Sequence, residues 1–119
     1  MTTTHKAIDL QLVQQYAGGD TDFAITLLET FAAEIPDIAA ALQQALHQQD
    51  WKTLSFKLHY LTNSATFCGA VPLKQMTWSL EEDLIENAHP PLDVIQQQLQ
   101  AIETELTRVQ NAIASGIKK

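Results

Sequence analysis

The sequence predicts an all-α fold, an antiparallel up-down four-helix bundle with a short extra helix at its N-terminal end. Apolar residues recur at three- and four-residue intervals in four long segments, and no segment shows the two-residue alternation of a strand. At 119 residues, of which 45% are hydrophobic, the chain is long enough for one core. We expect one domain over residues 1–119, with a flexible tail at residues 1–7.

The first two helices are predicted on either side of Gly18–Gly19. A short amphipathic helix over residues 8–16 ends at these glycines, which suit a left-handed helix terminus. Asp20 or Thr21 then caps a long helix. Its expected inward positions are Phe23, Leu27, Phe31, Ile35, Ile38, Leu42 and Leu46. Because an interior proline removes one backbone hydrogen bond, Pro36 predicts either one bent helix or two nearly coaxial ones.

The third helix is predicted between two local signals. Asp50 is placed to cap it, and Gly69 is placed to end it in the left-handed conformation. The helix should therefore run from about Trp51 to about Cys68. Its expected buried stripe is Leu54, Leu58, Leu61, Ala65 and Cys68.

The last two helices each follow a proline. The fixed φ of Pro72 suits the start of a helix, whose inward stripe is Leu73, Met76, Leu80 and Leu84. The chain then breaks at His89-Pro90-Pro91. The final helix carries the most regular pattern, Leu92, Ile95, Leu99, Ile102, Leu106, Val109 and Ile113. This seam suits a closely packed bundle, and a dimer formed through it is one alternative.

His59 lies one step off the buried stripe of the third helix. Short polar side chains surround it at helical spacing, namely Ser55, Thr62, Asn63 and Thr66. We therefore expect an imidazole on a partly exposed face, within reach of another macromolecule. A neutral imidazole is a good nucleophile, and an ordinary pKa of about 6.5 leaves most imidazoles neutral near pH 7. Structural or incidental roles are favoured for His5, His47 and His89.

The region around His59 resembles a known family. The residues that carry the resemblance are His59, Leu61, Ser64, Gly69, Leu73 and Leu80–Glu81. Their order is similar to that of histidine phosphotransfer (Hpt) domains, which read His-x-Leu-Lys-Gly-Ser, then a glycine, then Leu-Glu. The run from Gly69 to Lys74 also resembles the C-terminal Hpt modules of hybrid sensor histidine kinases of the GacS/BarA/LetS type. Thr62 and Asn63 depart from the pattern, which usually has lysine and glycine there.

The resemblance implies roles for the residues of this region. His59 is expected to be the phosphoacceptor. Glu81 is expected either to accept a hydrogen bond from the ring and fix its tautomer, or to be a surface carboxylate beside Glu82 and Asp83. The expected site-shaping residues are Glu81, Thr62, Asn63, Ser64 and Gly69. The expected phosphate or docking contacts are Ser55, Lys57, Lys74 and Thr66.

The resemblance also implies a phosphocarrier of a two-component phosphorelay rather than an enzyme. The sequence has no glycine-rich phosphate loop and no kinase motif, so we expect no cofactor and no metal in this chain. The expected partner is the receiver domain of a response regulator or hybrid sensor kinase, which would bring the magnesium ion. The alternative is a degenerate Hpt-like docking module that binds a receiver without being phosphorylated, and the departures at Thr62 and Asn63 keep this alternative open.

Charge and hydropathy bear on the class of partner and on the location of the protein. The net charge of −7, from seven cations and fourteen acids, argues against nucleic acid or an anionic membrane as the main partner. Three of the cations, Lys52, Lys57 and Lys74, flank His59 in the sequence. No apolar run approaches the roughly 20 residues of a membrane span, and the N-terminus lacks the apolar core of a signal peptide. We expect a cytoplasmic monomer in which the single Cys68 forms no internal disulfide.

Overall fold

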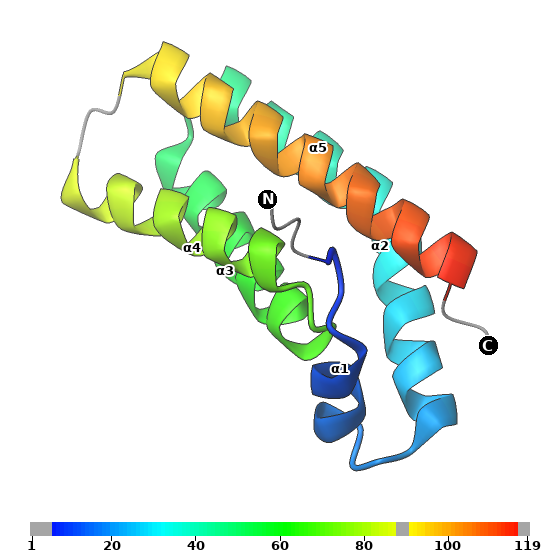
Figure 1. Cartoon of the computed structure of the whole chain (residues 1–119). Helices are drawn as coiled ribbons and strands as arrows, with labels where there is room; N and C mark the ends of the chain where they lie inside the picture. The colour runs from blue at the N-terminus through cyan, green and yellow to red at the C-terminus, as the bar shows by residue number, and fades with distance from the viewer. Residues whose placement is uncertain (1–5, 88–90, 117–119) are drawn as a thin grey trace, which may run out of the picture.

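The structure is a computed structural model that describes residues 6–87 and 91–116, and all regular structure within these ranges is α-helical. The helices are α1 (Leu10–Tyr16), α2 (Thr21–His47), α3 (Trp51–Phe67), α4 (Val71–Glu86) and α5 (Leu92–Gly116). The four long helices run alternately up and down, and α1 lies at the end of the bundle where α3 turns into α4 (Figure 1). The predicted bundle with a short N-terminal helix is confirmed.

Aspartates begin the first three helices. Asp9 caps α1, Asp20 caps α2 and Asp50 caps α3, and each carboxylate accepts a backbone N–H from the first turn. These bonds satisfy donors that have no partner inside the helix. The cap predicted at Asp50 is confirmed. Of the two candidates for α2, Asp20 is the cap and Thr21 is the first helical residue.

The helix α2 continues through Pro36 as one α-helix, so of the two predicted alternatives the single helix is observed. Its buried residues are Ala24, Leu28, Phe31, Ile35, Leu42, Ala45 and Leu46. Phe23, which was expected in the core, is 48% exposed. Each step of four residues turns a side chain by about 40° around the helix, so the run from Phe23 to Ile35 drifts by about 120°. This drift carries Phe23 out of the core.

The predicted buried stripe of α3 is confirmed. All five of its residues are at most 4% exposed. The helix α3 packs against α2 and α4. On α4, Leu73 and Leu80 are fully buried, whereas Met76 and Leu84 are partly buried against the core. His59 follows Leu58 of this stripe, so it is positioned at the edge of the α3–α4 contact.

The segment before α1 packs onto the turn between α3 and α4. The backbone N–H of Asp9 donates to the carbonyl oxygen of Gly69 at 2.8 Å. Ala7 and Ile8 are both 6% exposed. Ala7 therefore belongs to the core and not to a flexible tail, because its side chain is covered by the bundle. Residues 1–5 of the predicted tail lie outside the described residues.

The helix α5 packs against α2 and α4 with its apolar seam inward. Leu92 is 46% exposed, and the other six seam residues are buried. The seam is thus packed within one chain in this structure. His89 and Pro90 of the predicted break lie outside the described residues. Across residues 6–87 and 91–116 we find no helix with the length and hydrophobicity to cross a bilayer.

Candidate functional site

His59 lies near the middle of α3, and its side chain is 67% exposed. It lines a shallow groove between α3 and α4, called here the His59 groove. The residues of this groove are Trp51, Lys52, Ser55, Phe56, His59, Glu81, Leu84 and Ile85. The imidazole is therefore accessible to a partner macromolecule, as the sequence predicts.

Glu81 holds one side of the imidazole ring. Its Oε1 lies 3.0 Å from Nδ1 of His59, and its side chain is only 10% exposed. A carboxylate can only accept hydrogen bonds, so we assign the proton of the neutral ring to Nδ1 and the free lone pair to Nε2. Of the two expectations for Glu81, the structure supports contact with the ring, whereas Glu82 and Asp83 are exposed.

Two buried threonines lie behind Glu81. Oγ1 of Thr62 donates to Oε2 of Glu81 at 2.5 Å and lies 2.7 Å from Oγ1 of Thr77. Because the hydroxyl of Thr62 has one proton and directs it into the bundle, it has none left for a phosphate. Thr77 was not expected at the site from the sequence. It lies four residues before Glu81, a spacing that places both residues on one face of α4.

The other polar residues expected at the site are spread along α3. Ser55 lines the His59 groove, and Asn63, one turn after His59, is exposed. The hydroxyl of Thr66 donates to the carbonyl oxygen of Thr62 at 2.8 Å. Ser64 is partly buried and lies about 140° around the helix from His59, so it does not border the ring.

The expected cations are not equally close to His59. Lys74 lies seven residues before Glu81, about 10 Å along α4. Lys57 lines a second groove, called here the α2/α3 groove. Lys52, which lies two turns before His59 on α3, lines the His59 groove itself. Lys52 was not expected as a contact at the site, although a spacing of seven residues places it on the same helix face as His59.

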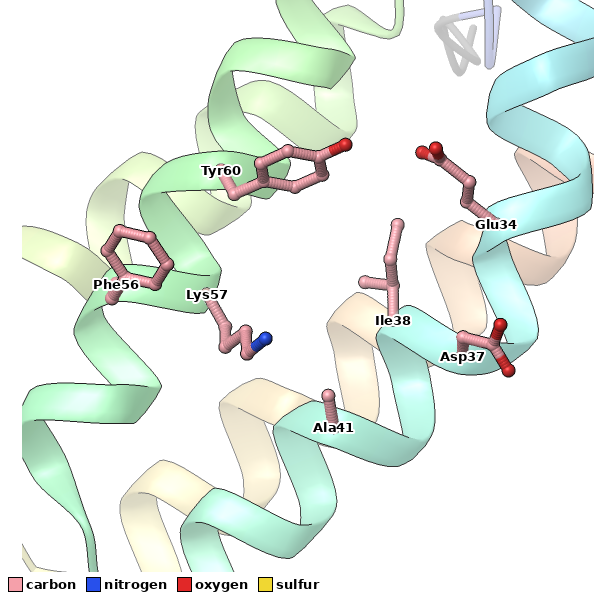
Figure 2. Close-up of a pocket in the computed structure, with 7 residues that line it drawn as sticks. All are labelled: Glu34, Asp37, Ile38, Ala41, Phe56, Lys57 and Tyr60. Carbon is pink, nitrogen blue, oxygen red and sulfur yellow. The ribbon is translucent and has the colours of Figure 1, made fainter.

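The α2/α3 groove adjoins the His59 groove. Its residues are Glu34, Asp37, Ile38, Ala41, Phe56, Lys57 and Tyr60. Figure 2 shows Phe56, Lys57 and Tyr60 on α3, across the groove from the α2 residues. Phe56 is 68% exposed and lines both grooves, and Tyr60 is 50% exposed. Exposed aromatic surface therefore continues from one groove to the other.

Gly69 serves the packing of the N-terminal segment. It lies ten residues after His59, about 15 Å along the helix direction. Its φ is +64°, and a Cβ added there would lie 2.5 Å from the backbone oxygen of Asp9 and 2.9 Å from Cγ2 of Val13. The structure thus ties Gly69 to the contact with Asp9 and Val13 rather than to the surface around His59.

Comparison with known proteins identifies the family. The model of the Hpt domain family matches residues 26–112, a span that contains His59, Glu81 and both threonines. The chain belongs to the Hpt domain family. The Hpt domain is also similar to a crystal structure, that of the HPT domain from the Hpt sensor hybrid histidine kinase of Shewanella. The two share 21% sequence identity over 91% of each chain with a TM-score of 0.79, a likeness that shows the fold.

Membership of the family places this Hpt domain among the histidine phosphotransfer domains of two-component phosphorelays, which act with receiver domains. A search of the curated proteins gave no match. Within the part of the Hpt domain that the structure describes, no group of three or more His, Cys, Asp or Glu side chains could hold a metal ion.

Proposed function

We propose that His59 accepts a phosphoryl group from the aspartyl phosphate of a receiver domain and passes it to the receiver of a response regulator. The observation that carries this proposal is the combination of a 67% exposed ring with an Nδ1 held 3.0 Å from a buried carboxylate. In the neutral ring, this geometry places the proton on Nδ1 and leaves Nε2 unprotonated, on the side of the ring away from Glu81. A nucleophile in that state needs no base to activate it.

The transfer follows from the protonation state of the ring. The lone pair of Nε2 attacks the phosphorus, and an N–P bond forms as the P–O bond to the aspartyl carboxyl group breaks. The electron pair of that bond leaves with the receiver carboxylate. Nδ1 keeps its proton, so the phosphorylated ring carries a positive charge that the carboxylate of Glu81 offsets. Attack by the aspartate of a second receiver reverses these changes.

The receiver is expected to supply the metal ion and most of the positive charge that the transfer needs. A phosphoryl group in transfer carries negative charge that a metal ion and cationic side chains neutralise. We assign the magnesium ion to the receiver, so that the Hpt domain acts as a phosphocarrier without a cofactor of its own. From this side, Lys52 is the cation that shares the groove with His59, and Asn63 offers an amide one turn away. Transfer then depends mainly on positioning.

The surface for the receiver is proposed around Phe56. This side chain is largely exposed and joins the His59 groove to the α2/α3 groove, where Tyr60 adds a second aromatic ring. Aromatic side chains that lose water on binding contribute strongly to protein interfaces. The acidic rim at Glu34 and Asp37 favours a receiver surface with basic side chains.

The test is phosphate transfer from receiver domains phosphorylated with acetyl phosphate and Mg²⁺. Acid-labile, base-stable phosphate should appear on the wild-type chain and on His47→Gln, which alters an exposed histidine at the end of α2, but not on His59→Gln. If neither the wild type nor His47→Gln were labelled by a receiver that binds the wild type, the alternative function of a docking module would be assigned instead. Label that persists on His59→Gln would refute the proposed acceptor.

A further inference from the structure

Three polar side chains are buried together beside His59, between α3 and α4. Thr62 is 9% exposed, Thr77 is 0% exposed and Glu81 is 8% exposed. Leu58 and Leu80, on the same two helices, are also fully buried. Buried polar groups are stable when each one has a hydrogen-bond partner. The direction of the hydrogen bonds in this cluster therefore determines how the carboxylate of Glu81 is held.

The number of protons and the distances together favour one direction for the bonds. The ionised carboxylate of Glu81 has no proton, and each threonine hydroxyl has one. The distance of 2.5 Å between Oγ1 of Thr62 and Oε2 of Glu81 is that of a hydroxyl donating to a carboxylate. Thr62 can then accept from Thr77, whose Oγ1 lies 2.7 Å away, closer than the alternative acceptor of Thr77, the carbonyl oxygen of Lys74 at 3.1 Å. The protons run in one direction, from Thr77 to Thr62 to Glu81.

We propose that Thr62 and Thr77 are positioning residues that act on His59 through Glu81. Their hydroxyl groups occupy Oε2 of the carboxylate and hold Oε1 toward Nδ1 of the imidazole, which keeps the proton on Nδ1 and the lone pair on Nε2. The inference rests on the proposed function for its purpose, because the unprotonated Nε2 is the nucleophile of that reaction. The geometry of the cluster stands without it.

The threonine at position 62 distinguishes this chain from the usual family pattern. Thr62 occupies the place where the resemblance leads one to expect a lysine, three residues after His59. A lysine side chain there would reach solvent and bring charge, whereas Thr62 is buried and brings a short, uncharged donor. Its alternative acceptor is the carbonyl oxygen of Leu58, at 2.9 Å. The bond to Glu81 competes with this one, and Thr77 favours it by donating to Thr62 from behind.

The test uses Thr62→Val, which keeps the shape of the side chain and removes the hydroxyl. The first readout is the tautomer of His59 in protein with ¹⁵N-labelled histidine, with the resonance assigned from its loss in His59→Gln. We expect the Nδ1–H form to predominate in the wild type and in Thr62→Ser, and to lose its predominance in Thr62→Val. Thr104→Val, which removes an exposed hydroxyl on α5, should leave the tautomer unchanged.

The second readout is the rate of phosphorylation by phosphoramidate. In this reaction Nε2 attacks the phosphorus, the P–N bond of the donor breaks and ammonia leaves, so no receiver takes part. We expect Thr62→Val to slow the reaction at least about tenfold, and Thr62→Ser to restore it. Thr77→Val should give a smaller loss, and it serves as the test if Thr62→Val does not fold.

The outcomes separate this proposal from the proposed function. A wild-type tautomer and a wild-type rate in a folded Thr62→Val or Thr77→Val protein would overturn the positioning role, even if receivers label His59. Conversely, a changed tautomer in Thr62→Val would support the positioning role, even if no receiver transferred phosphate. A mere loss of thermal stability moves neither readout in the folded protein, so a purely structural role predicts no change in either.

Discussion

His59 and Glu81 face each other from antiparallel helices, with 3.0 Å between Nδ1 and Oε1. The two residues differ sharply in exposure, since the ring is 67% exposed and the carboxylate side chain 10% exposed. One partner is therefore presented to solvent while the other is held by the core. This asymmetry suits a residue that must meet another protein while keeping a fixed protonation state.

Replacing Glu81 should weaken transfer more than stability. In Glu81→Ala the ring loses the acceptor at Nδ1, so we expect phosphorylation by a phosphorylated receiver to slow about 10- to 100-fold. The hydroxyl of Thr62 can turn to the carbonyl oxygen of Leu58, so the free energy of unfolding should change by no more than about 1 kcal/mol. Glu82→Ala, at an exposed neighbouring position, is the control. Equal rates for the two variants would contradict the role of Glu81.

Gly69 should be much less tolerant of substitution than Gly18. Both have a positive φ, +64° and +68°, so alanine at either costs about 1 kcal/mol in backbone strain. Only at Gly69 would the new Cβ meet the backbone of Asp9, whereas nothing lies within 4 Å at Gly18. We expect Gly69→Ala to lower the free energy of unfolding by about 2 kcal/mol more than Gly18→Ala in urea denaturation. Equal losses would show that the N-terminal segment does not press on this turn.

Phe56 should contribute to receiver binding but little to folding. Because its side chain is 68% exposed, truncation removes few internal contacts. We expect Phe56→Ala to weaken binding of a receiver about tenfold by titration calorimetry. Phosphorylation by phosphoramidate should keep its wild-type rate in this variant. Val94→Ala, at an exposed apolar position on α5, should bind as the wild type does. A receiver that bound both variants equally would place the interface elsewhere.

Cys68 should make stability fall at high pH. Burial, and to a lesser extent the charge of Glu34, raises the pKa of the Cys68 thiol from 9.0 to about 11. Between these values the unfolded chain releases a proton that the native chain keeps, so stability declines as pH rises from about 9 to about 11, by roughly 2 kcal/mol. Other groups titrate in this range, so the difference in unfolding free energy between the wild type and Cys68→Ala is the quantity to measure. A difference that stayed constant with pH would contradict the prediction.

Helical periodicity was sufficient to predict most of the fold. The stripe through Leu54, Leu58 and Leu61 places these residues in the core because four- and three-residue steps alternate and the drift cancels. From Phe23 to Ile35 all steps are of four residues, so the rotation of about 40° at each step accumulates. The prediction ignored this rotation and therefore placed Phe23 on the wrong face of α2. The cap at Asp50 depends only on neighbouring residues, and such local signals are readable from sequence.

The sequence predicted the site less completely, because the missing parts depend on contacts between helices. The pairing of His59 with Glu81 came from the family resemblance, and the structure supports it. The inward direction of Thr62 depends on Thr77, fifteen residues away on another helix. The role of Gly69 depends on Asp9, sixty residues earlier. Periodicity gives the face of a helix but not the neighbour that covers it.

The most direct test of the proposed function identifies the atom that carries the phosphoryl group. After transfer from a phosphorylated receiver, ³¹P and ¹⁵N NMR of histidine-labelled protein distinguish the two ring nitrogens of each histidine. We predict one phosphoryl group, on Nε2 of His59, with the proton still on Nδ1 beside Glu81. A phosphoryl group on Nδ1 of His59, or on His47, would contradict it.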